Sequence, residues 1–270
     1  MKNETPQKKN DDGNGSNHLQ SPHIYELIRQ KGVEELDRPR RSLFWSGIAA
    51  GIALSFSAYC TAFIHAALSE SLLQKALSSV GYTVGFIIVI FGRLQLFTEN
   101  TITAVLPALS EKSWGLWNKT AQLWGIVFLA NMIGSLGSIC FVYYGLHASG
   151  HSIEALVEVS MHLAHYSPTD CFLLGVPAGF LIASIVWMLP LAKGSEFWMI
   201  FLITYMISIG GMTHVVAGST EWFTLALVGK MSWADALFAG ILPTLIGNIA
   251  GGTGLFTMLS YGQTKEEMRT

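Results

Sequence analysis

Two polar stretches interrupt long apolar segments of this sequence, and they limit what the chain can fold into. RLQLFTENT, from Arg93 to Thr101, lies inside one apolar segment, and GGMTHVVAGS, from Gly210 to Ser219, lies inside another. Charged side chains and unpaired backbone groups are costly in hydrocarbon unless they face protein or a water-filled cavity. Two such interruptions in corresponding places of two halves predict two broken helices that meet near the bilayer midplane and form a substrate path.

The composition is that of a membrane protein. Of the 270 residues, 51% are hydrophobic and 13% are charged, whereas a globular domain has roughly 25% charged residues. Six apolar regions are present, and one helical crossing needs about 20 residues. Their approximate ranges are 43–66, 80–109, 117–146, 171–192, 197–228 and 235–260. The second and the fifth contain the polar stretches, and we expect each to be a half-helix, a short loop and a second half-helix.

Four parts are expected along the chain. Residues 1–20 are polar and are predicted to be a disordered tail without a signal peptide, and residues 42–262 form the transmembrane domain. Between them, residues 21–41 are expected to form an amphipathic helix, either on the membrane surface or packed on the cytoplasmic side of the protein. Residues 263–270 are predicted to be a cytoplasmic tail, and the connection 146–170 is predicted to contain a further surface helix.

Lysine and arginine predict the orientation in the membrane, because cytoplasmic connections carry an excess of both. With the amino terminus inside, Lys75 and Lys230 are external and Arg93 is within the membrane. The cytoplasmic set is Lys2, Lys8, Lys9, Arg29, Lys31, Arg38, Arg40, Arg41, Lys112, Lys119, Lys193, Lys265 and Arg269. Both termini are therefore predicted to be cytoplasmic.

The two halves repeat weakly. GIAAG, beginning at Gly47, corresponds to GVPAG, beginning at Gly175, and NMIGS, beginning at Asn131, corresponds to NIAGG, beginning at Asn248. Both pairs carry small residues at helical spacing, which lets helix backbones approach closely. Three crossings in each half give the halves opposite topologies, so the pattern predicts an inverted repeat.

Several classes of function are not predicted. No clustered basic face indicates nucleic-acid binding. Cys60, Cys140 and Cys171 have no metal-ligand spacing, and we expect them to be small packing residues. No phosphate-binding loop and no paired His/Cys motif is found, so neither catalysis, ATP use, a metal nor another cofactor is expected.

Three motifs carry a resemblance to a known family. LFTEN (Leu96 to Asn100) lies in the second apolar region, THVVAG begins at Thr213 in the fifth, and PTLIGNIAGG begins at Pro243 in the last. Over about residues 25 to 262 the chain resembles the formate/nitrite transporter family, and RLQLFTENTITAVLP is similar to its YfdC-type inner-membrane branch.

The resemblance implies an all-α membrane protein, an aquaporin-like six-helix bundle with an inverted repeat and broken second and fifth helices. It also implies a homopentamer in the bacterial inner membrane, with one pore in each protomer. Thr98 and His214 would then face each other at the middle of the pore, where Leu96 and Phe97 would add an apolar constriction.

The chain departs from the family pattern near these motifs. The family usually has a small residue and a carboxylate before the leucine–phenylalanine–threonine motif, where this chain has Arg93, Leu94 and Gln95. Gly218 replaces the usual asparagine, and Glu221 stands where apolar residues are common. The resemblance therefore implies the scaffold more firmly than it implies the substrate.

His214 and Thr98 are the main candidates for pore chemistry. A histidine on an apolar face can be a satisfied core residue. In a helix break it can also give a proton to a weak-acid anion or donate a hydrogen bond to it. A protonated anion passes an apolar constriction at lower cost, because its charge is removed. The Thr98 hydroxyl can donate to the anion or orient the imidazole, and it can also cap the half-helix that begins at Glu99.

Three charged residues lie at the same depth as this pair. Arg93, Glu99 and Glu221 form either an internal ion-pair network, which we favour, or a functional set with an anion-attracting arginine and a proton-relaying glutamate. Asn100 also lies along the predicted path, and we expect its amide, with those of Asn131 and Asn248, to hydrogen-bond the broken backbone.

The leading hypothesis is a channel or proton-coupled transporter for a small monovalent anion of a weak acid, such as formate or nitrite. Two alternatives remain open. An aquaporin-like pore for neutral solutes shares the helix pattern but normally has two asparagine–proline–alanine loops, which this sequence lacks. A non-transporting membrane partner or sensor would have its pore closed by the changed loop chemistry.

Overall fold

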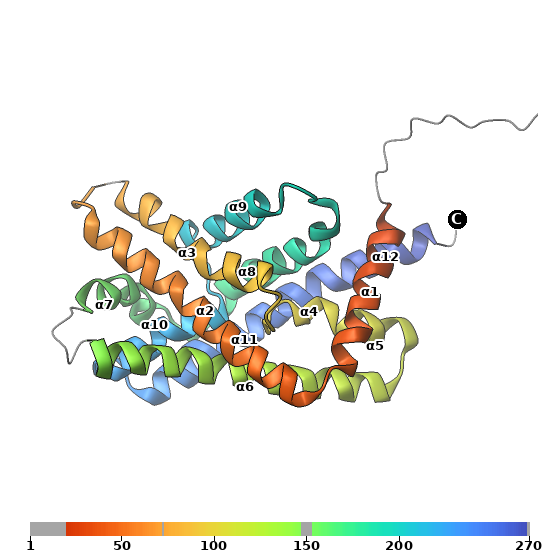
Figure 1. The fold of residues 1–270 in the computed structure, drawn as a ribbon, viewed down its shortest axis with the longest axis horizontal. Coiled ribbons are helices and arrows are strands. Elements are labelled where there is room, and N and C mark those ends of the chain that lie inside the picture. Colours follow the sequence, from red (N-terminus) through yellow and green to blue (C-terminus); the bar gives the residue numbers. More distant parts are fainter. Residues whose placement is uncertain (1–19, 72, 147–152, 269–270) are drawn as a thin grey trace, which may run out of the picture.

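A computed structural model of the protein describes residues 20–71, 73–146 and 153–268, and Figure 1 shows their arrangement. Within these residues every regular element is helical. In chain order the elements are α1 (Ser21–Asp37), α2 (Arg40–Ala67), α3 (Gln74–Phe91), α4 (Asn100–Thr103), α5 (Val105–Glu111), α6 (Trp114–Cys140), η1 (Phe141–Leu146), α7 (Glu154–Ser160), η3 (Met161–His165), α8 (Pro168–Met188), η4 (Leu189–Leu191), α9 (Glu196–Ile209), α10 (Val215–Leu227), η5 (Asp235–Ile241), α11 (Leu242–Ile249), η6 (Ala250–Thr257) and α12 (Met258–Glu267). The predicted all-α class is confirmed.

Five helical segments are long and apolar enough to cross a membrane, which agrees with a membrane protein. They are Arg40–Ala67, Gln74–Phe91, Trp114–Leu146, Pro168–Leu191 and Asp235–Glu267. The sequence predicted six apolar regions, and the fifth of these is divided between two shorter helices, α9 and α10. The helices stop at both polar stretches, because α3 ends nine residues before α4 begins and α9 ends six residues before α10 begins.

The same backbone turn ends α3 and α9. Arg93 has a φ of 50° and Gly211 a φ of 64°, so both residues are in the left-handed region. The next amide then bonds back into the helix: Leu94 N–H donates to the Val89 carbonyl and Met212 N–H donates to the Ile207 carbonyl, each at 3.0 Å. Glycine adopts this conformation without strain, whereas arginine pays a steric cost there.

The repeated small-residue motifs pack the helices in pairs. A Cβ atom at Gly51 of α2 would overlap the backbone carbonyl of Asn131 in α6, and a Cβ atom at Gly179 of α8 would overlap that of Asn248 in α11. The absence of a side chain at these two glycines therefore permits backbone contact between α2 and α6 and between α8 and α11. Close approach of this kind favours helix association in a bilayer, where burial from water adds little.

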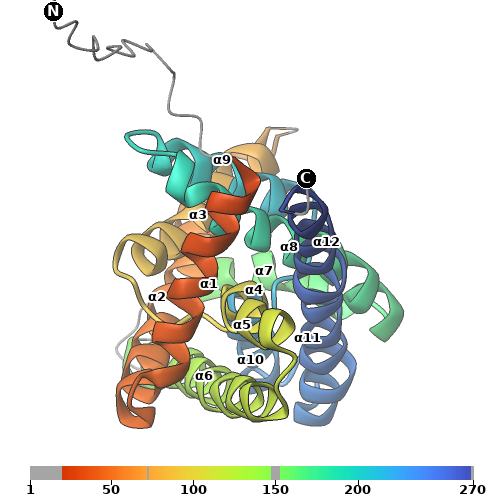
Figure 2. The same ribbon diagram turned by 90° about the vertical axis from the view of Figure 1, so that its right-hand side faces the viewer.

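Two short helical regions close the ends of the bundle. In Figure 1, α1 lies at the right-hand end and α7 at the left-hand end, and Figure 2 shows α1 crossing over α4 and α5. Ile24, Tyr25 and Ile28 of α1 are buried against Ile102 and Leu106. The apolar face of α1 thus packs on the protein, and α1 also contacts α12, which brings the first and last described helices to the same end.

Parts of the expected organisation fall at the edges of the described residues. Within the predicted tail 1–20, the described residues begin at Gln20. The connection 146–170 contains α7 and η3, while residues 147–152 lie outside the description. The last helix continues through the predicted tail as far as Glu267, because Gln263 and neighbouring residues keep helical hydrogen bonds.

Candidate functional site

One buried asparagine holds the first helix break. Asn131 of α6 is fully buried, and its side-chain amide donates to the carbonyl oxygens of Gly47 and Gln95 at 2.8 and 2.9 Å. Its Oδ1 accepts a hydrogen bond from Phe97 N–H at 3.0 Å. Two backbone groups that lost their helical partners at the break are therefore satisfied by one side chain, as a buried break requires.

The second break repeats this arrangement. Asn248 of α11 is also fully buried and donates to the carbonyl oxygens of Gly175 and Thr213 at 2.8 and 3.0 Å. Its Oδ1 accepts from Val215 N–H at 2.9 Å. The asparagine contacts flank His214 in this break and Leu96 in the other, so these two residues occupy corresponding positions.

Thr98 and His214 lie together between the two breaks. Thr98 Oγ1 is 2.7 Å from His214 Nε2, and both side chains are buried. His214 is also the N-cap of α10, where its Nδ1 accepts a hydrogen bond from Ala217 N–H at 3.2 Å. An Nδ1 atom that accepts carries no hydrogen, so the contacts specify the neutral imidazole with its hydrogen on Nε2.

The hydrogen on Nε2 fixes the role of the threonine hydroxyl. Nε2–H donates to Thr98 Oγ1, which leaves the hydroxyl hydrogen of Thr98 to point at a third group. Among the described residues no acceptor for that hydrogen is found. Thr98 is not a helix cap: α4 begins at Asn100, and its N-cap residue Glu99 makes no side-chain cap. The contacts therefore do not fit the capping role considered for Thr98; they fit a hydroxyl that accepts from the imidazole and keeps its own hydrogen available to donate.

Two cavities approach this pair from opposite ends of the bundle. The α1-side cavity, of about 610 Å³, is lined by residues that include Lys31, Glu35, Leu96, Glu99 and Asn100. The α7-side cavity, of about 400 Å³, is lined by residues that include Tyr82, His162, Tyr166, His214 and Glu221. Both linings include charged and polar side chains. His214 itself lines the α7-side cavity, and the α1-side cavity is lined by Leu96 and Glu99, which flank Thr98 in the sequence.

An aromatic residue separates the cavities. On one face of α3, Tyr82 lines the α7-side cavity and Ile90 lines the α1-side cavity. Phe86 lies between them at helical spacing, is fully buried, and packs edge-on against the His214 ring at a centroid distance of 5.0 Å. The barrier between the cavities therefore consists of an apolar ring and one hydrogen-bonded polar pair.

The structure brings some of the predicted site residues together and separates others. Arg93, Leu96, Glu99 and Asn100 line the α1-side cavity, and Glu221 lines the α7-side cavity. Phe97 lines neither, because its ring packs against Trp124 and Phe128 of α6 at centroid distances of 5.6 and 5.4 Å. Phe86, rather than Phe97, is the aromatic residue that lies between the two cavities.

The favoured ion-pair network among Arg93, Glu99 and Glu221 is not formed. Arg93 is exposed, and the described part of the chain gives it no ion pair. Glu99 and Glu221 line different cavities, with the barrier between them. Glu99 Oε1 is buried and has no hydrogen-bond partner among the described residues.

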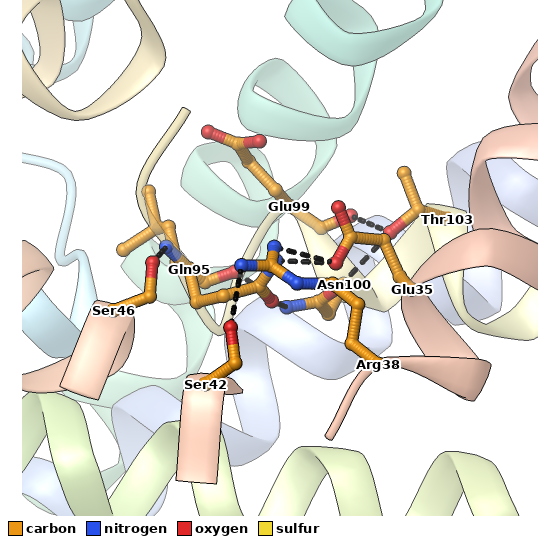
Figure 3. A network of polar contacts seen from close by, with 9 residues as sticks. Glu35, Arg38, Ser42, Ser46, Gln95, Glu99, Asn100 and Thr103 are labelled. Carbon is orange, nitrogen blue, oxygen red and sulfur yellow. Dashed lines mark hydrogen bonds and ion pairs between the residues drawn. The ribbon is translucent and has the colours of Figure 1, made fainter. Parts of the chain in front are cut away.

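Asn100 serves the backbone of the first break, as expected. Its amide donates to the Leu96 carbonyl and to Gln95 Oε1, both at 3.1 Å, and its Oδ1 accepts from Thr103 at 3.1 Å. Figure 3 shows that this network extends to α1, where Glu35 accepts from the Gln95 amide.

Sequence reasoning missed two features of the site. Glu35 and its partner Arg38, with a hydrogen bond of 3.0 Å, reach from α1 into the network of Figure 3. Their only sequence signal was the charged face of a short helix. Phe86 was missed because an aromatic residue in an apolar helix is ordinary; its spacing of four residues from Tyr82 and from Ile90 is the pattern that could have marked it.

The fold and site define a helical membrane protein with two interrupted helices that meet at a buried threonine–histidine pair. The family model for formate/nitrite transporters matches residues 22–262, and the chain belongs to the formate/nitrite transporter family. It is 38% identical over 246 residues to the inner membrane protein YfdC of Escherichia coli, covering 91% of this chain and 79% of that protein.

Two further comparisons agree with this membership. The formate channel FocA of Haemophilus influenzae is 26% identical over 238 residues, covering 77% of this chain and 82% of that protein. A solved pentameric formate channel with formate bound superposes with a TM-score of 0.72 at 20% identity, covering 84% of this chain and 98% of that one. The structural likeness shows that the two share a fold.

Proposed function

We propose that the protein is a channel or proton-coupled transporter for small monovalent anions of weak acids, with formate and nitrite as the leading candidates. The observation that carries this proposal is the Thr98–His214 contact, which lies between two cavities lined in part by charged and polar side chains. A hydroxyl hydrogen with no acceptor of its own suits a small anion, which accepts hydrogen bonds and fits a narrow path. Family membership and the names of the relatives support the same substrate class.

The barrier favours passage of the neutral acid. Phe86 and Leu96 are buried and apolar, and a lone charge beside them would lose its hydration without gaining a charged partner. An anion that takes up a proton in one cavity would cross as the neutral acid and release the proton in the other. Thr98 would donate one hydrogen bond during the passage, while His214 holds the hydroxyl in position and keeps its own hydrogen.

The proposed architecture is an aquaporin-like six-helix bundle with an inverted repeat. In this scheme α3 with α4 and α5 forms the second crossing, and α9 with α10 forms the fifth. The matched contacts of Asn131 and Asn248 support the repeat. We propose residues 42–262 as the channel domain and five protomers with one pore each, since the structural relative is a pentameric channel.

The proposed location is the bacterial inner membrane with both termini in the cytoplasm. The relative YfdC is named as an inner membrane protein. Lysine and arginine concentrate on the side of the chain ends, and α1 and α12 lie together at one end of the bundle. The α1-side cavity then opens to the cytoplasm and the α7-side cavity to the outside. No catalytic step or cofactor forms part of this proposal.

Flux through proteoliposomes tests the substrate class. Purified full-length protein, shown by native mass spectrometry to be pentameric, is reconstituted and assayed with formate, nitrite, hydrosulfide and glycerol, and protein-free liposomes provide the background. Uptake of the weak-acid anions without glycerol supports the proposal. Glycerol uptake alone would indicate a neutral-solute pore. No flux from a folded pentamer would favour a non-transporting partner or sensor.

A further inference from the structure

A carboxyl group stands in the α7-side cavity, where an incoming anion has to pass. Glu221 lies on α10, its side chain is 11% exposed, and its Oε2 is 3.9 Å from His162 Nδ1. No hydrogen bond to the Glu221 carboxyl group is found among the described residues. An ionised carboxylate here would repel an anion, and a protonated carboxyl would instead donate a hydrogen bond or a proton to it.

Glu221 and His214 line the same cavity. His214, Gly218 and Glu221 all line the α7-side cavity from α10. Glu221 follows His214 by seven residues, or about 10 Å of helix. An acid formed at Glu221 therefore has only a short, enclosed distance to travel before it reaches the barrier.

His162 connects the buried carboxyl group with the outside. It lies on η3, in the segment that covers the α7 end of the bundle, and 48% of its side chain is exposed. Its Nδ1 donates to the Val159 carbonyl at 2.7 Å, which leaves Nε2 as the atom that accepts a proton. Burial lowers the pKa of His162 from its ordinary value, so the protonated ring gives up its proton more readily.

Other titratable groups face the same cavity. They are His65, Lys75, Tyr82, Tyr166 and His214. His65 has its own partner, since its Nε2 lies 3.3 Å from Glu158. Lys75 is the one lysine or arginine in this lining, and it would attract an anion to the cavity. Glu221 is the one carboxyl group in the cavity lining.

Given the proposed function, on which this inference rests, we propose that His162 and Glu221 form a proton-loading site for the transported anion on the α7 side. The O–H bond of the Glu221 carboxyl group breaks as the anion gains the proton and becomes a neutral acid. The Glu221 carboxylate then regains a proton from Nδ1 of the His162 imidazolium, which lies 3.9 Å from Glu221 Oε2. Nδ1 delivers it once a small side-chain rotation turns this N–H from the Val159 carbonyl to the carboxylate. His162 takes its next proton from external water.

Uptake of formate at varied external pH tests this site. Wild-type protein and single variants are reconstituted in liposomes at fixed internal pH, the external pH is stepped from about 5 to 8 to span histidine titration, and uptake by protein-free liposomes is subtracted. Glu221→Gln should lower uptake at neutral pH by about tenfold and flatten its pH dependence, and Glu221→Asp should restore both in part. His162→Gln should move the midpoint by about one pH unit or more, as expected on removal of a neighbouring charge.

His165→Gln is the matched control. His165 lies on the same short segment, and its Nδ1 bonds a backbone carbonyl in the same way, at 3.0 Å from Met161, but it does not line the cavity. Its pH profile should equal that of wild type. Wild-type profiles for both His162→Gln and Glu221→Gln, in protein that transports formate, would overturn the proton-loading site and leave the proposed function intact. If Glu221→Gln does not fold, the pH profile of His162→Gln alone tests the proton-loading site, because His162 is half-exposed. A wild-type profile in that variant would then overturn the site.

Discussion

Nε2 of His214 lies 2.7 Å from the hydroxyl oxygen of Thr98, although 116 residues separate the two in the chain. Nδ1 of the same ring accepts from Ala217 N–H. The ring is thus bonded on both sides, and the Thr98 hydroxyl hydrogen is the one hydrogen of the pair that is free to reach a passing anion. Under the proposed function, we expect His214 to act as a positioning residue and Thr98 to be the group that contacts substrate.

Thr98→Val should reduce formate flux by at least about tenfold. Valine keeps the shape of threonine but has no hydroxyl, so the acid would cross with one hydrogen bond unmade, and leaving a buried polar group unpaired costs roughly 1–3 kcal/mol. Thr98→Ser, which keeps the hydroxyl, should retain most of the flux. Liposome assays of the two variants in parallel provide the comparison, and equal losses in both would show that only the packing of Thr98 matters.

His214→Asn should lower the flux and leave the midpoint of its pH dependence unchanged. The asparagine amide can donate toward Thr98 or accept from Ala217 N–H but cannot reproduce both distances, so the hydroxyl is held less well. The pH dependence resides elsewhere if His162 and Glu221 load the proton. A formate uptake series over about pH 5 to 8 measures this. Loss of the inflection in His214→Asn alone would identify His214 as the titrating group.

Asn131→Ala should destabilise the protein by several kcal/mol. The substitution leaves the Gln95 carbonyl and the Phe97 N–H of the break without their partner, and each such buried group costs roughly 1–3 kcal/mol. Asn118→Ala, on the exposed face of the same helix, is the control and should change stability by less than about 0.5 kcal/mol. Thermal unfolding in detergent compares the two, and a similar small effect at both sites would mean that water satisfies the break.

Gly51→Ala should disrupt the packing of α2 on α6. A Cβ atom at this position overlaps the Asn131 backbone, and overpacking costs roughly 1–3 kcal/mol or more. Gly125→Ala in α6 is the matched control, because nothing lies within 4 Å of a Cβ atom there. Alanine at Gly125 should be neutral or stabilising by up to about 1 kcal/mol. Yield and unfolding temperature should therefore fall in the first variant only.

Arg93→Ala should leave stability within about 0.5 kcal/mol of wild type, because Arg93 is exposed and the described residues offer it no ion pair. An arginine held in a buried ion-pair network would instead cost about 3–5 kcal/mol when removed. Arg93→Gly should be neutral or stabilising, because glycine relieves the left-handed backbone at a φ of 50°. Thermal unfolding of the two variants distinguishes these cases, and a loss of several kcal/mol in Arg93→Ala would restore the ion-pair hypothesis.

The positions of the helix breaks were predictable because their cause is local. A run such as RLQLFTEN cannot continue a lipid-facing helix, whatever surrounds it. The small-residue repeats were also informative, because small residues at helical spacing predict close contact between helix backbones. Gly51 and Gly179 make such contacts. The helical class of the protein, the two helix breaks and the family membership could therefore be predicted from the sequence.

The partners of individual side chains were not predictable in the same way. Arg93, Glu99 and Glu221 were expected to meet because they have opposite charges and similar depth. In the fold the barrier of Phe86, Thr98 and His214 lies between the two glutamates, and Arg93 occupies an exposed turn. Phe97 and Leu96 are neighbours in sequence, yet only Leu96 faces a cavity, because adjacent residues point in different directions.

The sequence by itself determined that this chain is a helical membrane protein of a transporter family, interrupted at two places. Those properties follow from hydropathy, backbone hydrogen bonding and motif, which are features of short segments. The resemblance already implied that Thr98 faces His214, but only the tertiary structure decided how the two hydrogen-bond, that Phe86 lies between the two cavities, and that Glu221 shares a cavity with His162. These relationships join distant segments, and the packing of helices sets them to within an ångström.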